Sequence, residues 1–232
     1  MPRNARCVEP GLAYHVTQRG TNRERVFFAI ADYKLYLDLL RSQLATTGVE
    51  VLAYCLMSNH VHLVVVPRAA DALGVLFRRV HGGYAQYGNV RRGRTGHLWQ
   101  QRFFSCPMSE KHLWSGVRYV ERNPCRAGLV DTPEQYQWSS AAAHLGIGGD
   151  RFGVLDMDFW AKAGGAAKWR EMLAAPDATQ AEAEAEDQLR RATYSGRPFG
   201  EAEFLERLSG KFQRQWRKPL NLAPAPDDSA VA

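Results

Sequence analysis

Two histidines one residue apart, His60 and His62, are the first candidates for chemistry in this sequence. They lie in residues 58–66, an apolar and β-branched run that is typical of a strand buried on both faces. Because side chains alternate between the two faces of a strand, both imidazoles lie on the same face. Neighbouring imidazoles are half of a metal site. The spacing is short and common, so two structural histidines, or a zinc site completed by a cysteine, are alternatives.

A second candidate pair, Tyr119 and Asn123, lies well downstream. The apolar spacing of residues 113–120, after Ser109 as N-cap, predicts a helix that ends near Asn123 because Pro124 follows. Residues four apart on a helix share a face, so the phenol and the amide lie on the same side. From spacing alone, a half-buried core tyrosine and a helix-terminal asparagine are the simpler explanation.

The residues around these pairs predict the elements that must position them. Alternating or β-branched apolar residues indicate strands, and apolar residues at helical spacing indicate helices. The expected order is a strand at 12–19, a helix at 32–46, strands at 49–56 and from residue 60, a helix from residue 71 and a strand at 98–104. Such a split βαβ order predicts an α+β, ferredoxin-like fold: an antiparallel sheet with helices on one face and the first and third strands in its centre.

A basic segment precedes the last predicted strand. Residues 91–96 form an arginine-rich loop punctuated by glycine, and Trp99, Arg102 and Phe103 follow. Cations bind phosphates and flat aromatic faces stack on bases, so this pattern is typical of a groove for single-stranded nucleic acid. An ordinary solvated loop explains the charge equally well.

The chain changes character beyond residue 140. Residues 146–150 are glycine-rich, residues 181–186 alternate alanine with glutamate, and a turn at 196–200 precedes a helix with a basic end. That end either contacts DNA or carries ordinary surface charge. We predict a first domain at 1–145, a linker and helical segment at 146–192, a basic element at 193–222 and a disordered tail at 223–232. The basic end consists of Lys211, Arg214, Arg217 and Lys218.

The composition narrows the class of protein. The chain has 232 residues, with 30 lysines and arginines against 24 aspartates and glutamates, a net charge of +6 and a pI near 9.3. This charge favours polyanionic partners without requiring them. The four cysteines have no paired spacing, which indicates reduced thiols. We find no apolar signal segment and no run long enough to cross a membrane, so we expect a cytoplasmic protein without a membrane partner.

Several motifs in one order resemble a known family. The His-hydrophobic-His strand and the later run 119–124 are similar to the single-tyrosine HUH transposases, which include the IS200-like enzymes. The closer resemblance is to the REP-associated tyrosine transposases, linked to repetitive extragenic palindromes of bacteria. Cys125 stands where these proteins usually have valine, and residues 145–190 carry no matching motif. The further matching motifs are residues 19–23 (RGTNR), 57–62 (MSNHVH), 98–103 (LWQQRF), 123–130 (NPCRAGLV) and 196–200 (GRPFG).

The resemblance implies that residues 1–145 are a catalytic domain and 193–222 a DNA-binding element. His60, His62 and Asn123 would hold a divalent ion, Mg²⁺ with Mn²⁺ able to substitute. Tyr119 would attack a phosphodiester of single-stranded DNA beside a palindromic hairpin, leaving a 5′-phosphotyrosine and a free 3′-hydroxyl. The protein would be a monomer or homodimer at the bacterial nucleoid.

Charge, stacking ability or motif position marks a set of candidate DNA contacts. Two other functions remain possible. A hairpin-binding protein that does not cut DNA would not need the metal-binding residues that this sequence retains, and a structural zinc protein would need cysteines at ligand spacing, which it lacks. The candidate DNA contacts are Arg3, Arg6, Arg19, Asn22, Arg23, Arg78, Arg79, Arg92, Arg94, Trp99, Arg102 and Arg197.

Overall fold

The structure, a computed structural model, describes residues 7–174 and 180–216. Within these ranges no helix has the length and apolar character that a membrane span needs. The predictions made for Arg3, Arg6, Arg217, Lys218 and the tail at 223–232 lie outside the described residues.

The elements follow the predicted order, and the described residues form one four-stranded antiparallel sheet with the order β2-β3-β1-β4. The strands are β1 (Ala13–Arg19), β2 (Val49–Leu56), β3 (His60–Pro67) and β4 (Phe104–Met108). The α-helices are α1 (Ile30–Thr47), α2 (Ala72–Arg92), α3 (Glu110–Glu121), α4 (Asn123–Arg126), α5 (Ala141–His144), α6 (Met157–Lys162), α7 (Gly165–Ala174), α8 (Gln180–Ser195) and α9 (Ala202–Phe212). Two short 3₁₀ helices are η1 (Thr21–Arg23) and η2 (Pro133–Gln135).

Strands β1 and β3 occupy the centre of the sheet, as predicted. Every residue of β3 is buried, which confirms a strand covered on both faces. In the register of the two central strands, Thr17 lies opposite His62 and Arg19 lies opposite His60. The α+β fold class predicted from the sequence is therefore confirmed.

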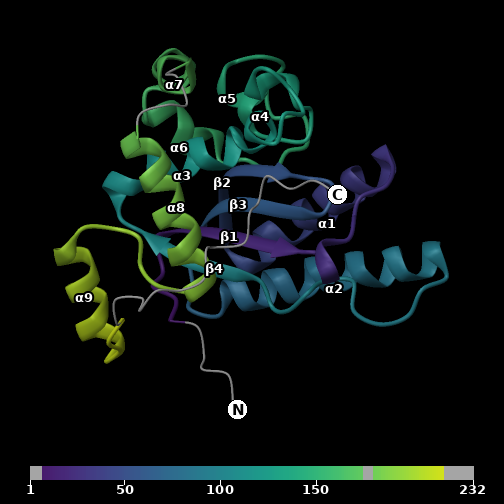
Figure 1. Cartoon of the computed structure of the whole chain (residues 1–232), viewed down its shortest axis with the longest axis horizontal. Coiled ribbons are helices and arrows are strands. Elements are labelled where there is room, and N and C mark those ends of the chain that lie inside the picture. Colours follow the sequence, from purple (N-terminus) through teal and green to yellow (C-terminus); the bar gives the residue numbers. More distant parts are fainter. Residues whose placement is uncertain (1–6, 175–179, 217–232) are drawn as a thin grey trace.

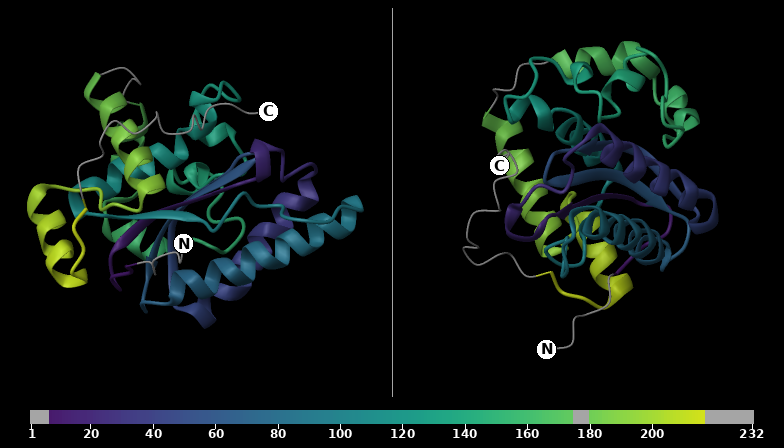
Figure 2. Two further views of the ribbon diagram at one scale, coloured as in Figure 1. Left: turned by 60° about the horizontal axis from the view of Figure 1, so that its bottom comes forward. Right: turned by 90° about the vertical axis from the view of Figure 1, so that its right-hand side faces the viewer.

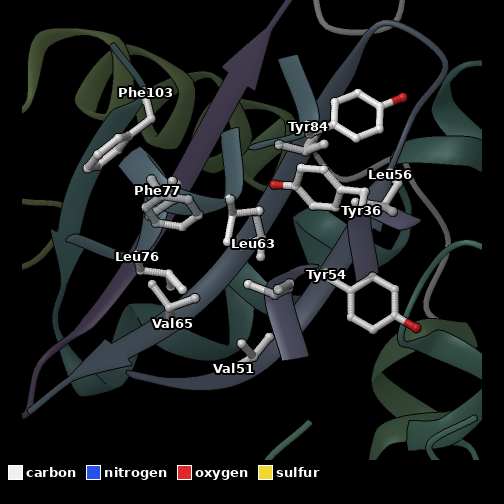
Figure 3. Packing of buried hydrophobic residues seen from close by; sticks show 14 of the residues in the cluster. Tyr36, Val51, Tyr54, Leu56, Leu63, Val65, Leu76, Phe77, Tyr84 and Phe103 are labelled. Atoms are coloured by element: carbon white, nitrogen blue, oxygen red, sulfur yellow. The ribbon is translucent and has the colours of Figure 1, made fainter. Parts of the chain in front are cut away.

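Helices cover both faces of the sheet (Figures 1 and 2). Helices α1 and α2 of the split βαβ unit pack together on one face, as expected, over a core that includes Tyr36, Leu63, Val65 and Phe77 (Figure 3). The prediction that helices cover only one face of the sheet is correct for α1 and α2 of the split βαβ unit and wrong for the described chain as a whole. The other face is covered by α3 and the C-terminal helices α6, α7 and α8.

The predicted strand at 98–104 is wrong in its position, because β4 begins at Phe104. Leu98 and Trp99 are adjacent in sequence and both pack into the core beneath α2, which the alternation of a strand does not allow. This segment instead forms an isolated bridge between Trp99 and Gly20. A Cβ on Gly20 would lie 2.3 Å from the Glu24 carbonyl oxygen, so the turn after β1 requires glycine.

Three smaller boundaries also differ from the prediction. Arg91 and Arg92 belong to the last turn of α2, which ends at Gly93 in a left-handed conformation, so the basic loop is shorter than expected. Asn123 does not end α3 but begins the short helix α4. Helix α8 crosses residue 193, and its residues Leu189 and Ala192 pack with Trp160 and Trp169 from the segment predicted as a linker.

A buried polar cluster joins α3 to the C-terminal helices. Glu121 is fully buried, and one of its carboxyl oxygens is 2.5 Å from both the Ser140 hydroxyl and His144 Nδ1. The other oxygen accepts a hydrogen bond of 2.6 Å from the Trp169 indole. Because donors from α5, with its N-cap Ser140, and from α7 meet one carboxyl group, Glu121 fixes the end of α3 against both helices.

We expect Glu121→Ala to lower the free energy of unfolding by about 3 kcal/mol, because it removes the acceptor of the buried His144 and Trp169 donors. The Ser140 hydroxyl keeps the Tyr54 carbonyl as a second acceptor. Urea denaturation followed by circular dichroism measures the change. Glu206→Ala on the exposed side of α9 is the matched control and should stay within about 0.5 kcal/mol of the parent. An equal loss in both variants would contradict the role of the cluster.

None of the four cysteines, all of which lie in the described residues, forms a disulfide, as predicted, and they differ in burial. Burial raises the pKa of the Cys106 thiol to about 12 and raises that of Cys55 well above its usual range, whereas Cys7 and Cys125 are partly exposed. A raised pKa lowers the thiolate fraction at pH 8. Titration with an aromatic disulfide reagent at pH 8 should therefore show two fast and two slow thiols, and all four should react rapidly in urea.

Candidate active site

The two sequence-predicted histidines lie side by side on β3, on the face that α3 covers. Both His60 and His62 are fully buried, and their ring centroids are 4.8 Å apart with an interplanar angle of 88°. The alternation of strand side chains thus places both imidazoles where the sequence predicted them. Their environment is the interior of the protein rather than an open surface.

Tyr119 reaches the same place from α3. Its ring lies edge-on to the rings of His62 and His15, with 5.5 Å between centroids in each case. Helix α3 approaches the sheet closely at Gly116, where a Cβ would lie 2.5 Å from the Met108 sulfur of β4. Tyr119 is 2% exposed, so the phenol is covered in this structure.

The ring of His60 is oriented by its neighbour in sequence. His60 Nδ1 is 2.5 Å from the side-chain oxygen of Asn59, whose amide nitrogen donates to the Arg23 carbonyl at 3.0 Å. An amide oxygen only accepts, so the proton is on Nδ1 and the lone pair is on Nε2. This is the tautomer that binds a metal through Nε2.

His15 is a part of the site that the sequence analysis did not select. Its Nε2 lies 2.9 Å from His62 Nδ1, and its Nδ1 lies 2.7 Å from the hydroxyl of Thr193 on α8. The alternation of Tyr14 and Val16 against His15 placed this histidine on the polar face of β1, and that signal was sufficient to find it. Nothing in the sequence around Thr193 indicates its position.

Arg126 is a second residue that only the structure identifies as part of the site. Its guanidinium carbon lies 4.2 Å from the centroid of the Tyr119 ring, and Nη2 donates to the Tyr119 carbonyl at 2.8 Å. Nη1 pairs with Glu186 of α8 at 3.1 Å. The cation lies over the ring of Tyr119 and connects it to α8. Arg126 lies within the matching run 123–130, which is the signal that could have found it.

Asn123, the third predicted ligand, follows Tyr119 by one helical turn and is 1% exposed. Among the described residues, its side-chain nitrogen has no hydrogen-bond partner. Amide oxygen and nitrogen exchange places when the group turns by 180°. A buried amide without a partner is uncommon in folded proteins, because the cost of its desolvation is not repaid.

Burial determines the charge state of the His62 imidazole. Desolvation lowers the pKa of His62 well below its usual range, and the nearby His60 and His15 lower it further. A neutral imidazole is the form that coordinates a metal. Across the described ranges, no three side chains of histidine, cysteine, aspartate or glutamate are placed to share an ion.

Three predicted DNA contacts line one groove with a volume of about 810 Å³ beside α2: Arg78, Trp99 and Arg102. Trp99 lies at its base, because the indole is 8% exposed and donates to the His81 carbonyl. The other predicted contacts lie elsewhere. Asn22 and Arg23 are exposed in η1, Arg19 is buried and Arg197 is half-buried. The other three contact protein groups: Arg94 forms an ion pair with Glu24, Arg92 lies over the Phe28 ring, and Arg79 donates a hydrogen bond to Gln43.

The comparisons with known proteins agree with this geometry. Residues 9–123 match the family model described as transposase IS200-like. This segment contains the sheet, the histidine pair, Tyr119 and Asn123. Over this segment, which is just under half of the chain, the sequence has the pattern of the IS200-like transposase family.

Within that class, the chain is similar to a structure of the REP-associated tyrosine transposase bound to a REP hairpin. The identity is 18%, the match covers 66% of this chain and 90% of the other, and the TM-score is 0.54, which shows a shared fold. A protein of Deinococcus radiodurans R1 matches with 22% identity over 48% of this chain and 88% of its own, with a TM-score of 0.36. No protein of curated function matches the chain.

Proposed function

We propose that this chain is a transposase that cleaves and rejoins single-stranded DNA beside a hairpin, with Tyr119 as the nucleophile. The observation that carries the proposal is the contact of the Tyr119 ring with the rings of His62 and His15. A phenol and an imidazole pair from distant parts of the sequence share one buried site. The family of the domain supports the reaction class, and the hairpin bound by the similar REP-associated transposase supports the substrate.

The proposed reaction is a transesterification. The phenol of Tyr119 loses its proton, its oxygen forms a bond to phosphorus, and the bond from that phosphorus to the 3′ oxygen breaks. The 3′ oxygen takes up a proton, and the 5′ phosphate stays on the tyrosine. Attack by a 3′-hydroxyl on this phosphotyrosine releases Tyr119 and reseals or transfers the strand. The phosphotyrosine bond retains the energy of the phosphodiester, so no ATP is needed.

His60, His62 and Asn123 are the residues that would hold a divalent cation. Neutral imidazole nitrogens and an amide oxygen suit Mn²⁺ and Mg²⁺ and leave coordination positions for phosphate and water. When bound, the cation neutralises the phosphate and stabilises the charge of the transition state. Because these side chains carry no formal charge, we expect the affinity for Mg²⁺ to rise when the DNA phosphate is present.

The groove beside α2 is the proposed path of the DNA backbone. Arg78 and Arg102 are exposed at its rim, and both guanidinium groups suit phosphate oxygens. A Cβ placed on the rim residues Gly74, Gly82 or Gly96 would meet no atom within 4 Å, so the backbone there leaves room for a strand.

One observation favours a second function, a hairpin-binding protein that does not cut. Tyr119 is 2% exposed, and a phosphodiester reaches its hydroxyl only after the covering groups move. Formation of a covalent adduct distinguishes the two functions.

We expect Tyr119→Phe to abolish the covalent adduct while the affinity for hairpin DNA changes less than about twofold, because only the nucleophilic oxygen is removed. The measurement uses labelled hairpin DNA with a single-stranded flank, incubated with Mg²⁺, Mn²⁺ or EDTA and run on a denaturing gel. Tyr87→Phe, on the opposite face of the sheet, is the control and should keep the adduct. An adduct formed by Tyr119→Phe would refute the assignment of the nucleophile.

Each of the changes Arg78→Ala and Arg102→Ala should weaken hairpin binding and reduce the slope of log affinity against log salt by about 0.7 to 0.9. Fluorescence anisotropy across a NaCl series measures both effects. Arg79→Ala is the matched control, since this neighbouring arginine turns toward Gln43 of α1. Unchanged slopes for Arg78→Ala and Arg102→Ala would place the DNA elsewhere.

A further inference from the structure

A row of three buried polar groups leads from α8 to the proposed metal ligand His62. The Thr193 hydroxyl lies 2.7 Å from His15 Nδ1, and His15 Nε2 lies 2.9 Å from His62 Nδ1. The two imidazole planes are within 10° of each other. Each of these three residues is at most 1% exposed, so protein groups rather than bulk water determine where their protons lie.

The direction of the hydrogen bonds in this row follows from Thr193. Its hydroxyl donates to the carbonyl of Leu189, four residues earlier in α8, at 2.8 Å. The Cys106 thiol also lies 3.2 Å from this oxygen. A hydroxyl has a single proton, so a Thr193 oxygen that donates to Leu189 acts as an acceptor toward both His15 and Cys106. His15 therefore carries its proton on Nδ1 and accepts at Nε2 the proton of His62 Nδ1. The lone pair of His62 is consequently on Nε2.

The opposite direction would disable the ligand. If the Thr193 hydroxyl donated to His15 Nδ1, then His15 would donate from Nε2 to His62 Nδ1, and the proton of His62 would lie on Nε2. A protonated ring nitrogen has no lone pair for a metal. The two histidines thus obtain the same tautomer from different partners. The tautomer of His60 is set by Asn59, its neighbour in sequence. That of His62 is set by His15, 47 positions away, which in turn contacts Thr193, 178 positions from His15.

We propose that Thr193 and His15 are positioning residues that set the tautomer of His62, so that its Nε2 can bind the divalent cation. This inference rests on the proposed function of the site. It makes α8, which lies outside the segment that matches the family model, a part of the active site.

Two substitutions of Thr193 separate positioning from simple packing. Thr193→Val keeps the shape and removes the acceptor, whereas Thr193→Ser keeps the acceptor and removes a methyl group. Thr47→Val is the matched control, because Thr47 is a buried helical threonine whose hydroxyl donates to the carbonyl of Gln43 at 2.8 Å, on the other face of the sheet. The full-length chain is used, and circular dichroism confirms that each variant folds.

The first measurement is the affinity for Mn²⁺, taken from the electron paramagnetic resonance signal of the free ion. We expect Thr193→Val to bind Mn²⁺ about 10- to 100-fold more weakly than the parent, as is typical when the hydrogen-bond partner of a ligand is lost. Thr193→Ser and Thr47→Val should stay within about twofold. Equal Mn²⁺ affinity in the parent and Thr193→Val would overturn the proposal.

The second measurement is the ¹⁵N spectrum of the histidine rings without metal, with the His62 signals assigned by their loss in His62→Gln. The parent should show the proton on Nδ1 of His62, and Thr193→Val should show a mixture of tautomers. A proton on Nε2 of His62 in the parent overturns the proposal. If the parent shows the proton on Nδ1 of His62 but binds no Mn²⁺, the metal part of the proposed function and the purpose assigned to Thr193 are both overturned. The ¹⁵N spectrum alone then establishes the direction of the hydrogen bonds.

Discussion

The burial of imidazole groups in the centre of the sheet is the constraint on which the rest of the site depends. A buried polar atom without a partner costs about 1 to 3 kcal/mol, so every ring nitrogen here must be matched by a group of the protein or by a ligand. Bulk water does not reach His15, His60 or His62, which are at most 1% exposed. Their partners come from the loop before β3, from β1 and from α8. If the histidine face of β3 were open to solvent, water could act as the hydrogen-bond partner of these imidazoles.

The position of Tyr119 depends on a comparable set of contacts around α3. Gly116 lets the helix approach β4, Glu121 joins its end to α5 and α7, and Arg126 covers the phenol ring. Arg118 and Arg122, which form a row beside Tyr119, donate to the carbonyls of Met172 and Leu173 in α7. These arginines stabilise the packing of α3 on α7. The contacts of these five residues together determine where the Tyr119 hydroxyl lies.

The sequence predicted the elements that carry the site better than the groups that complete it. Strand alternation predicted that His60 and His62 share a face of the sheet, and helical spacing predicted that Tyr119 lies on a helix, because both are local rules. The role expected of Tyr119 came from the family resemblance and not from spacing. The central position of β1 and β3 followed from the order of elements. The strand at 98–104 was misplaced because the apolar pair Leu98 and Trp99 packs beneath α2, a tertiary contact that no local pattern records. Thr193 and Glu186 escaped notice for the same reason, since their partners His15 and Arg126 are far away in sequence.

The contacts of α8 with His15 and Arg126 have a consequence for what a match to the family model means. The family model ends at residue 123, whereas Thr193 and Glu186 lie on a helix that begins at Gln180. A chain that ended before Gln180 would still contain the whole matching segment, with His60, His62, Tyr119 and Asn123. In such a chain, His15 would have no Thr193 hydroxyl as its acceptor, and Arg126, which lies over the Tyr119 ring, would have no Glu186 carboxylate as its partner. A match to the family model over residues 9–123 therefore does not report whether the α8 groups that contact His15 and Arg126 are present, and the sequence up to residue 195 has to be read as well.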